Sequence, residues 1–385
     1  MKIKAEDWLI DDDFHQQKRK EPKGKGVQID EDEIKVARQI QTFFKSLLAR
    51  SISVEDKNKL RNEIELSLKT ERKNKIWIRW AATAAMLIFG FSATYLIYTT
   101  KLVSPIEHYA RNLENQNATD NTILILGDKK EVAIADKDSK ISYEPNGKKI
   151  QINQHQQVST INDTTAQAFH SIIVPYGKRS EIVLSDGTKV WLNSGTKLVF
   201  PASFDTEERE VYLQGEAIFE VQNHNNSRFF VRTDDFSIKV TGTVFNVTAY
   251  SDEEYSSTVL ERGHIEIIGE RGLLSNQTLK MDPGSMTVYD SKEKSFISSE
   301  VNPDDYLSWR DGFLTLHRRK LTNIIKKLSR YYNIDIVLED ESLDDDTFTG
   351  LLDLKNSPQE VLEVISRMVP LKVDEKNGKI LINSK

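Results

Sequence analysis

The chain has 385 residues, enough for two or three domains, and a formal net charge of −6 that comes from intermixed acids and bases. It contains no long basic block, so direct binding of nucleic acid through phosphate contacts is not expected. It also contains no cysteine, which excludes disulfides, thiolate metal sites and a cysteine nucleophile. The cellular compartment must therefore be inferred from other features.

The N-terminal part, residues 1–30, is polar and charged and predicts a flexible segment. Residues 31–75 predict a small all-α segment of two amphipathic helices, the second of which begins at Ser53 with Asp56 three positions later. The predicted apolar stripe consists of Val36, Ile40, Phe43, Phe44, Leu47, Leu60, Ile64 and Leu68. Helices this short bury too little surface to be stable alone, so we expect the stripe to bind a cytosolic protein. The alternative is that the two helices pack only on each other.

Residues 80–100, WAATAAMLIFGFSATYLIYTT, form the one long run without a charged side chain. At about 1.5 Å per residue the run reaches roughly 31 Å, the thickness of a bilayer's hydrocarbon core. We therefore predict one transmembrane helix within 76–100; the alternative is a buried helix of a soluble core. Lysine and arginine are more frequent before the run than after it, which predicts a cytoplasmic N-terminus. Residues 101–120 then form an exposed periplasmic linker.

From 121 to 301 the hydrophobic period is two, which predicts an all-β periplasmic domain. In VPYGKRSEIVLSDGTKVWLNSGTKLVF, residues 174–200, the pair Asp186-Gly187 separates two alternating strands, a strong hairpin signal. A second turn follows at Ser194-Gly195. A two-sheet sandwich and a short β-solenoid both accommodate this pattern.

The segment 124–143 repeats the pattern of 182–200, with Leu126 in the place of Leu184 and Asp128 in the place of Asp186. A repeated ladder unit favours architecture over an active site. No histidine stands in a motif with these serines and aspartates, and no histidines lie at ligand spacing. The sequence therefore predicts no catalytic, cofactor or metal site, and we do not expect an enzyme.

Residues 302–385 predict a small α+β domain made of two β-α-β units. The second unit repeats the first at an offset of 37, so that Ile324 corresponds to Val361 and Leu328 to Ile365. Ser357-Pro358-Gln359-Glu360 is a start signal for the second helix, and Asn377-Gly378 predicts a closing hairpin.

Several of these stretches are similar to a known family. "VPYGKRSEIVLSDGTKVWLNSGTKLVFPASF", "REVYLQGEAIFEV" and "VTGTVFNVTAY" resemble the periplasmic β-domain of the FecR family of anti-sigma factors, in the form common in Bacteroidetes. "WRDGFLTL" followed by "LTNIIKKLSRYYNIDI" resembles that family's C-terminal domain, which is similar to the short N-terminal domain of secretins and TonB-dependent transducers. The resemblance covers nearly the whole chain.

This resemblance implies a single-pass anti-sigma factor of a bacterial inner membrane, with no enzymatic activity. Its helices at 31–75 would hold an extracytoplasmic-function sigma factor. Its periplasmic part would receive a signal from the N-terminal signalling domain of a TonB-dependent outer-membrane transducer. Family members are commonly released by proteolysis, so intramembrane and periplasmic proteases are further implied partners, acting at 101–120 and near Gly90. The alternative from another class is an inner-membrane-anchored periplasmic binding or scaffold protein.

Overall fold

The computed structural model describes residues 31–48, 53–100, 104–113, 120–153, 156–159, 168–204, 207–224, 227–269, 278–344, 346–369 and 371–384. Helical side chains at 31–34, 47–48, 67–79 and 96–100 also lie outside this description. The chain divides into two compact units, Met1–Ile97 and Tyr98–Lys385. The predicted flexible segment, 1–30, lies outside the described residues.

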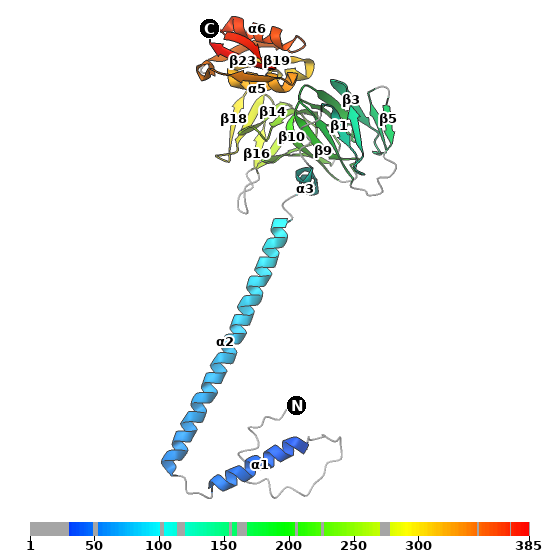
Figure 1. The fold of residues 1–385 in the computed structure, drawn as a ribbon. Coiled ribbons are helices and arrows are strands. Elements are labelled where there is room, and N and C mark those ends of the chain that lie inside the picture. Colours follow the sequence, from blue (N-terminus) through cyan, green and yellow to red (C-terminus); the bar gives the residue numbers. More distant parts are fainter. Residues whose placement is uncertain are drawn as a thin grey trace. The chain divides into compact units, whose positions relative to one another are not determined.

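The first unit contains helix α1 (Glu31–Leu48) and all but the last three residues of helix α2, which runs from Val54 to Thr100 (Figure 1). Ser53 caps α2 as expected, since its Oγ accepts backbone N–H groups of Glu55 and Asp56 at 3.2 and 3.4 Å. The predicted second amphipathic helix and the predicted span are not separate elements, because α2 contains no proline to break it. Over the described residues, no helix has the length and apolar character required to cross a membrane.

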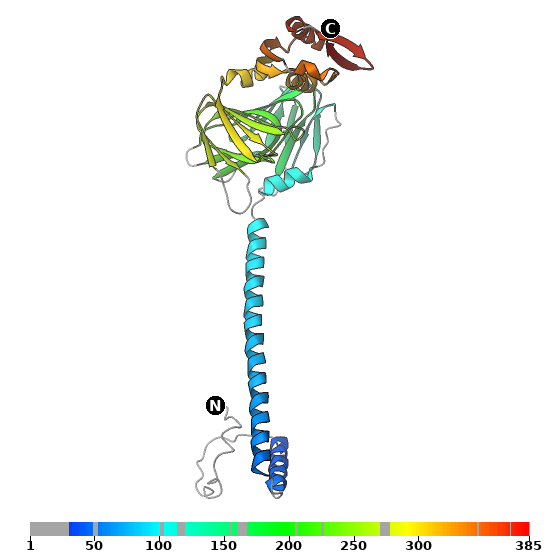
Figure 2. The ribbon, with the colours of Figure 1, turned by 90° about the vertical axis from the view of Figure 1, so that its left-hand side faces the viewer.

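Two mainly antiparallel sheets form the larger part of the second unit and pack face to face (Figures 1 and 2). The first sheet has the order β2 (Glu131–Ile134), β1 (Thr122–Ile125), β6 (Phe169–Val174), β9 (Thr196–Pro201), β10 (Glu208–Glu220), β11 (Arg228–Arg232), β12 (Phe236–Val240), β15 (Ile265–Gly269) and β16 (Thr278–Met281). The second has the order β5 (Gln156–Ser159), β4 (Lys149–Ile152), β3 (Asp138–Tyr143), β7 (Arg179–Val183), β8 (Lys189–Leu192), β10, β13 (Val244–Ala249), β14 (Tyr255–Arg262), β17 (Ser285–Asp290) and β18 (Ser295–Glu300). The domain is therefore a two-sheet sandwich and not a solenoid.

Strand β10 belongs to both sheets. Its first half pairs with β9 and β11, and its second half, from Gly215 onward, pairs with β8 and β13. The strand changes sheet at Gly215, whose φ is +119° and whose added Cβ would lie 2.6 Å from the Cα of Thr196. Only glycine fits this corner without strain. Phe219, four residues after Gly215, stacks with Phe245 in the core, and the two ring centroids lie 5.3 Å apart.

The repeat predicted between 124–143 and 182–200 is confirmed at its turns. In each copy a leucine N–H donates to the carbonyl four residues later at 2.9 Å, and an aspartate Oδ1 accepts the N–H two residues later at 3.0 Å. The residues are Leu126, Asp128 and Lys130 in the first copy and Leu184, Asp186 and Thr188 in the second. The left-handed position is Lys129 in one copy and Gly187 in the other. These short polar residues are turn formers, as the sequence predicts.

Helix α3 (Pro105–Asn112) lies within the range 101–120 that the sequence predicts as an exposed linker. Ser104 caps it, and proline at the first position suits a helix start. It buries Ile106 and Ala110 against β9 and β10 of the first sheet. The linker prediction is wrong for these residues, because they form part of the folded β-domain. Most of the rest of that range lies outside the described residues.

The C-terminal domain follows α4 (Asp304–Leu307) and a short 3₁₀ turn, Ser308–Asp311. Its elements are β19 (Phe313–Lys320), α5 (Leu321–Tyr332), β20 (Asp335–Leu338), a 3₁₀ turn (Glu341–Asp344), β21 (Thr347–Asp353), α6 (Pro358–Met368), β22 (Leu371–Lys376) and β23 (Lys379–Ser384). The two β-α-β units are present, but the two strands of each unit lie in different sheets: β19 pairs with β21, while β23 lies between β20 and β22. The helix start at Ser357 is confirmed by a complete capping box with Glu360.

The corner at Gly215 gives a stability prediction. We expect Gly215→Ala to lower the free energy of unfolding by about 2–4 kcal/mol, because the methyl group meets backbone and the φ is unfavourable. Denaturant unfolding of the full-length chain in detergent measures this. The matched control is Gly187→Ala, where φ is +82° but the added methyl group would lie 3.8 Å from its nearest neighbour, the Cγ of Gln222; it should cost about 1 kcal/mol. Equal losses in both variants would contradict a special role for the corner.

Candidate interaction sites

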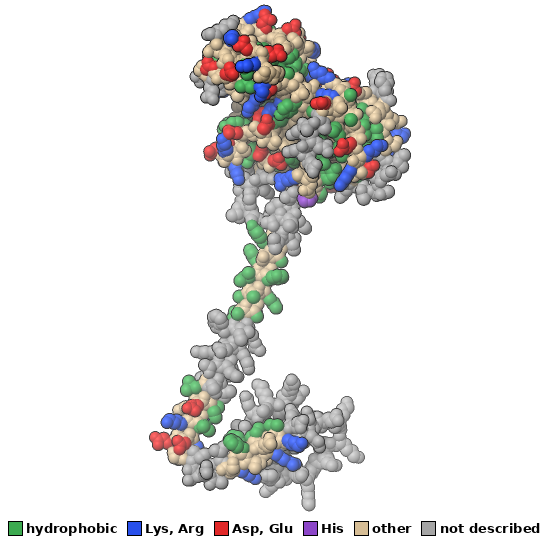
Figure 3. Space-filling view, viewed as in Figure 1, with side chains coloured by type: hydrophobic (Ala, Val, Ile, Leu, Met, Phe, Trp, Pro, Cys, Tyr) green, Lys and Arg blue, Asp and Glu red, His purple; other side chains and the backbone are tan. Residues whose placement is uncertain are grey.

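The predicted apolar stripe of the first unit lies on helix surfaces that are open to solvent. Figure 3 shows hydrophobic side chains gathered along α1 and along α2. The stripe residues whose side chains are described are between 51% and 64% exposed: Val36, Ile40, Phe43, Phe44, Leu60 and Ile64. The side chains of Leu47 and Leu68 lie outside the described residues. Large apolar groups repeated on one helix face are typical of a protein-binding surface, and their partner stays a prediction.

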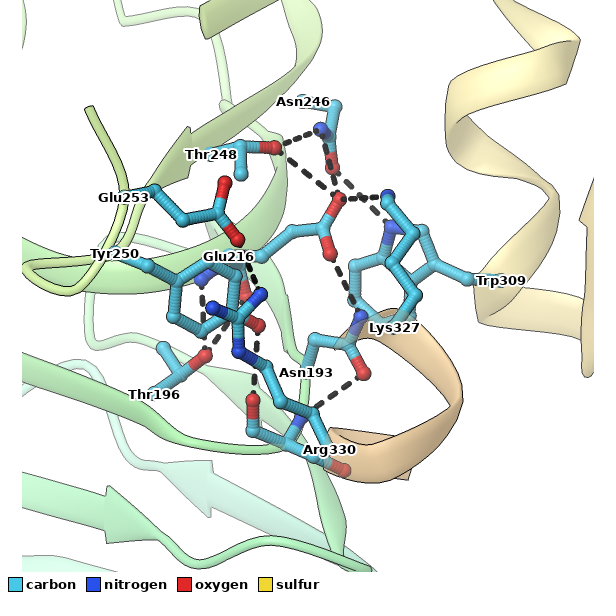
Figure 4. A network of polar contacts seen from close by, with 11 residues as sticks. Asn193, Thr196, Glu216, Asn246, Thr248, Tyr250, Glu253, Trp309, Lys327 and Arg330 are labelled. Atoms are coloured by element: carbon cyan, nitrogen blue, oxygen red, sulfur yellow. Dashed lines mark hydrogen bonds and ion pairs between the residues drawn. The ribbon is translucent and has the colours of Figure 1, made fainter. Parts of the chain in front are cut away.

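A second site lies within the other unit, where α5 of the C-terminal domain docks on loops of the β-domain (Figure 4). Arg330 of α5 is buried there, and its Nη2 lies 3.0 Å from both carboxylate oxygens of Asp252. It also pairs with Glu253, and its guanidinium lies over the ring of Tyr250, 3.8 Å from the centroid. Burial acts to lower the pKa of Arg330, but the surrounding acidic groups outweigh it and raise the pKa overall. The arginine is therefore a permanent charge that bridges two domains.

A buried carboxylate forms the centre of the same interface. Glu216 follows the Gly215 corner, and its side chain is only 4% exposed. Its donors are Asn193 at 2.8 Å, Thr248 at 3.2 Å and Asn246 at 3.3 Å. Lys327 of α5 lies 3.7 Å away, and Trp309 donates its indole N–H to Asn246 (Figure 4). A buried carboxylate is stable only when such donors replace water. The three hydrogen-bond donors belong to the β-domain and hold Glu216 in place, and Lys327 forms its contact with the C-terminal domain.

Apolar packing extends the interface on the outer face of the second sheet. Trp309 and Leu307 pack against Ile218, Val244 and Val259 in one buried cluster. This apolar contact fixes the segment before the C-terminal domain to the β-domain, and the ion pairs of α5 join the C-terminal domain itself to the β-domain.

The segment from Val174 to Phe200 supplies part of this interface. Gly177 donates its backbone N–H to the carbonyl of Arg330 at 2.8 Å, and the Arg179 guanidinium lies over the ring of Tyr331. Further along, the carbonyl of Ser194 accepts the Tyr250 hydroxyl at 2.8 Å. Sequence reasoning predicted turns here but missed the docking role, because the partners are far apart in the chain.

A groove of about 240 Å³ opens beside the docked helix. The second sheet contributes Tyr255, Met286 and Val288, and the C-terminal domain contributes Arg319 and Lys326. Within the described part of the chain, no group of three metal-ligating side chains is arranged to hold an ion.

Comparisons with known proteins agree with this domain order. A family model described as "FecR protein" matches residues 170–266, and one described as "FecR, C-terminal" matches residues 313–382. Two crystal structures of a proposed anti-sigma factor from Parabacteroides distasonis ATCC 8503, at 1.65 and 2.50 Å resolution, are similar to the chain, with TM-scores of 0.52 and identities of 27% and 26%. Each comparison covers 56% of this chain and 99% of the other. No curated protein matches the chain.

The ion pairs of Arg330 lead to a prediction about the interface. We expect Arg330→Met to lower the free energy of unfolding by about 2–3 kcal/mol, because Glu253 loses its partner while Asp252, 60% exposed, regains water. Denaturant unfolding of the full-length chain measures the change. Arg367→Met is the control, since that arginine forms an exposed pair on α6 and its loss should change stability by less than about 0.5 kcal/mol. If both variants were equally stable, Arg330 would not hold the domains together.

The buried tyrosine at the interface predicts a loss of stability in alkali. Burial raises the pKa of Tyr250 well above its ordinary value, so the folded protein keeps the proton after the unfolded chain has lost it. Its contribution is complete below the unfolded pKa of about 10 and declines as pH rises above that value. We expect Tyr250→Phe to cost about 1 kcal/mol at pH 7 and to reduce the fall in stability between pH 9 and 12. Unfolding curves across this pH range test it; identical slopes in both proteins would contradict it.

Proposed function

Because the chain belongs to the FecR family of anti-sigma factors, we propose that it holds an extracytoplasmic-function sigma factor and controls its release across a bacterial inner membrane. The signal would come from the N-terminal signalling domain of a TonB-dependent outer-membrane transducer. The family is regulatory and not enzymatic. The observation that carries the proposal is the exposed apolar stripe of α1 and α2 in a chain with this family's domains.

The stripe has the form expected of a helix-in-groove ligand. On α1, Val36, Ile40 and Phe43 recur at helical spacing, and each is more than half exposed. Phe44 widens the face and meets Phe43 edge to face, with ring centroids 6.4 Å apart. A surface of this kind is costly in water and is stabilised when a partner covers it. Bound to the sigma factor, it would cover apolar surface that core polymerase needs.

We propose that α2 crosses the inner membrane through residues 76–100. The support is the run from 80 to 100 without a charged residue, together with a high exposure of its large apolar side chains. Those described are Trp80, Met86, Leu87, Ile88, Phe89, Phe91 and Tyr95. With the basic residues before the run in the cytoplasm, the β-domain and the C-terminal domain are periplasmic.

The interface between the β-domain and the C-terminal domain supports the proposed transmission of a signal from the transducer to the β-domain. A transducer that binds the C-terminal domain would act on a body already fixed to the β-domain through Arg330 and Glu216. A force that displaces the C-terminal domain would therefore be transmitted directly to the β-domain through these contacts. Proteolytic release by periplasmic and intramembrane proteases remains a prediction from the family.

One observation favours the alternative of an anchored binding protein. The groove of about 240 Å³ beside α5 has apolar and charged walls and could accept a ligand of the envelope. Under that alternative the helices before residue 76 serve only as an anchor. The two proposals differ in whether those helices bind a sigma factor.

We therefore expect the 1–75 fragment to recover its cognate sigma factor in a pull-down. Phe43→Asp should weaken this binding at least tenfold, because a charge enters an apolar contact. Thr42→Asp, on the side of α1 away from the stripe, is the matched control and should bind as the unmodified fragment does. Failure of the unmodified fragment to recover the sigma factor, with the fragment soluble and helical by circular dichroism, would count against the anti-sigma proposal.

A further inference from the structure

The β-domain and the C-terminal domain have separate hydrophobic cores. The core of the β-domain is built from residues between Leu124 and Tyr289, and that of the C-terminal domain from residues between Leu314 and Ile382. Among the described residues, none belongs to both cores. The two domains can therefore separate without exposing either core to water.

Charged side chains dominate the contact of α5 with the β-domain (Figure 4). Arg330 pairs with Asp252 and Glu253. Lys327 lies 3.7 Å from Glu216, so in each pair the cation comes from α5 and the acid from the β-domain. Asp252 is 60% exposed and Lys327 39%, which lets dissolved ions reach both sites. Salt should therefore weaken the docking, whereas it does not weaken an apolar contact.

Packing between the two domains is looser than packing within either core. A cavity of about 20 Å³, the size of one water molecule, lies where Trp309 and Leu314 meet Lys327 and Arg330. The groove of about 240 Å³ opens at the same interface. Water can thus enter between the domains, and separation gives up few close apolar contacts.

The chain has a pivot between the two bodies. Leu307 and Trp309 belong to the apolar cluster on the second sheet, whereas Leu314 belongs to the core of the C-terminal domain. Gly312 lies between them with φ of +85°, in a region where glycine changes conformation at little cost. The backbone rotation that moves one domain relative to the other can therefore occur at this residue.

Side-chain contacts across the pivot are polar or involve a charge. Thr315 donates its hydroxyl to the hydroxyl of Ser308 at 3.2 Å, and the Arg319 guanidinium lies over the ring of Tyr306. Water can replace the partners of both groups when the domain moves.

We propose that α5 is an electrostatic latch: at raised ionic strength the C-terminal domain leaves the β-domain as a folded body, with the chain bending at Gly312. Release uncovers Lys327, Arg330 and Tyr331, which contact the β-domain in the docked state. The β-domain thus withholds a basic helix face that becomes available only in the released state. The proposal concerns the docking of these two domains and is independent of the sigma-factor proposal.

Hydrogen exchange of the unmodified, full-length chain in detergent tests the latch. The N–H of Gly177 donates across the interface to the carbonyl of Arg330 at 2.8 Å, whereas the N–H of Gly284 donates within the β-domain to the carbonyl of Leu260 at 2.9 Å. The Debye length falls from about 10 Å at about 0.1 M salt to about 3 Å at about 1 M. Over this range of sodium chloride, at constant pH, exchange should accelerate several-fold at Gly177 and stay unchanged at Gly284. An unchanged Gly177, or equal acceleration of both amides, would overturn the proposal.

The absence of native cysteine permits a second test by disulfide formation. A Cβ atom at Gly177 would lie 3.0 Å from the Cβ of Asn333, so the pair Gly177→Cys and Asn333→Cys is close enough to be joined. With a mild oxidant, this pair should crosslink several-fold more slowly in about 1 M than in about 0.1 M sodium chloride. The matched control is Val288→Cys with Ile297→Cys, which face each other within the β-domain and should crosslink at a rate that salt does not change.

Charge removal completes this experiment. In the Gly177→Cys and Asn333→Cys chain, Lys327→Met should slow crosslinking at low salt, because one of the latch contacts is lost. Arg367→Met, on the exposed face of α6, should leave the rate unchanged. Crosslinking that responds neither to salt nor to Lys327→Met would show that the docking is not an electrostatic latch.

Discussion

The change of sheet within β10 determines how the rest of the second unit is arranged. Before Gly215 the strand is part of the first sheet, which carries α3; after it, the strand is part of the second sheet, which carries the C-terminal domain. The same corner turns Glu216 and Ile218 onto the outer face of the second sheet, where both contact residues beyond 300. One backbone conformation thus serves both the sandwich and the docking of its neighbour.

The docking interface combines two kinds of contact with different physical consequences. The apolar cluster around Trp309 fixes the segment that precedes the C-terminal domain to the second sheet, and it stabilises the contact in proportion to the apolar area that it removes from water. The ion pairs of Arg330 and the hydrogen bonds to Glu216 add little net energy, but they are costly to break one partner at a time. Such an interface resists gradual loosening and separates only when several contacts are lost together.

The sequence predicted those features whose signals are local. Asp186-Gly187 specifies its turn and Ser357 its helix start, because the residues that form each motif are within a few positions of one another. The contact of Arg330 with Asp252 spans 78 residues and depends on where two domains meet, so no spacing could reveal it. The helix after Ser104 did carry a local signal, a cap followed by proline, which the polar composition of the range obscured.

The two repeated halves of the C-terminal domain differ in their contacts with the β-domain. At the offset of 37, the docking residues Lys327, Arg330 and Tyr331 of α5 correspond to Val364, Arg367 and Met368 of α6. The α5 set contacts the β-domain, whereas Val364 and Met368 are 39% and 46% exposed and Arg367 pairs only within its own helix. The two halves of the domain therefore share a core pattern but differ on their surfaces. The face of α5 binds the β-domain, whereas the corresponding face of α6 is exposed to solvent, where substitutions do not affect the fold.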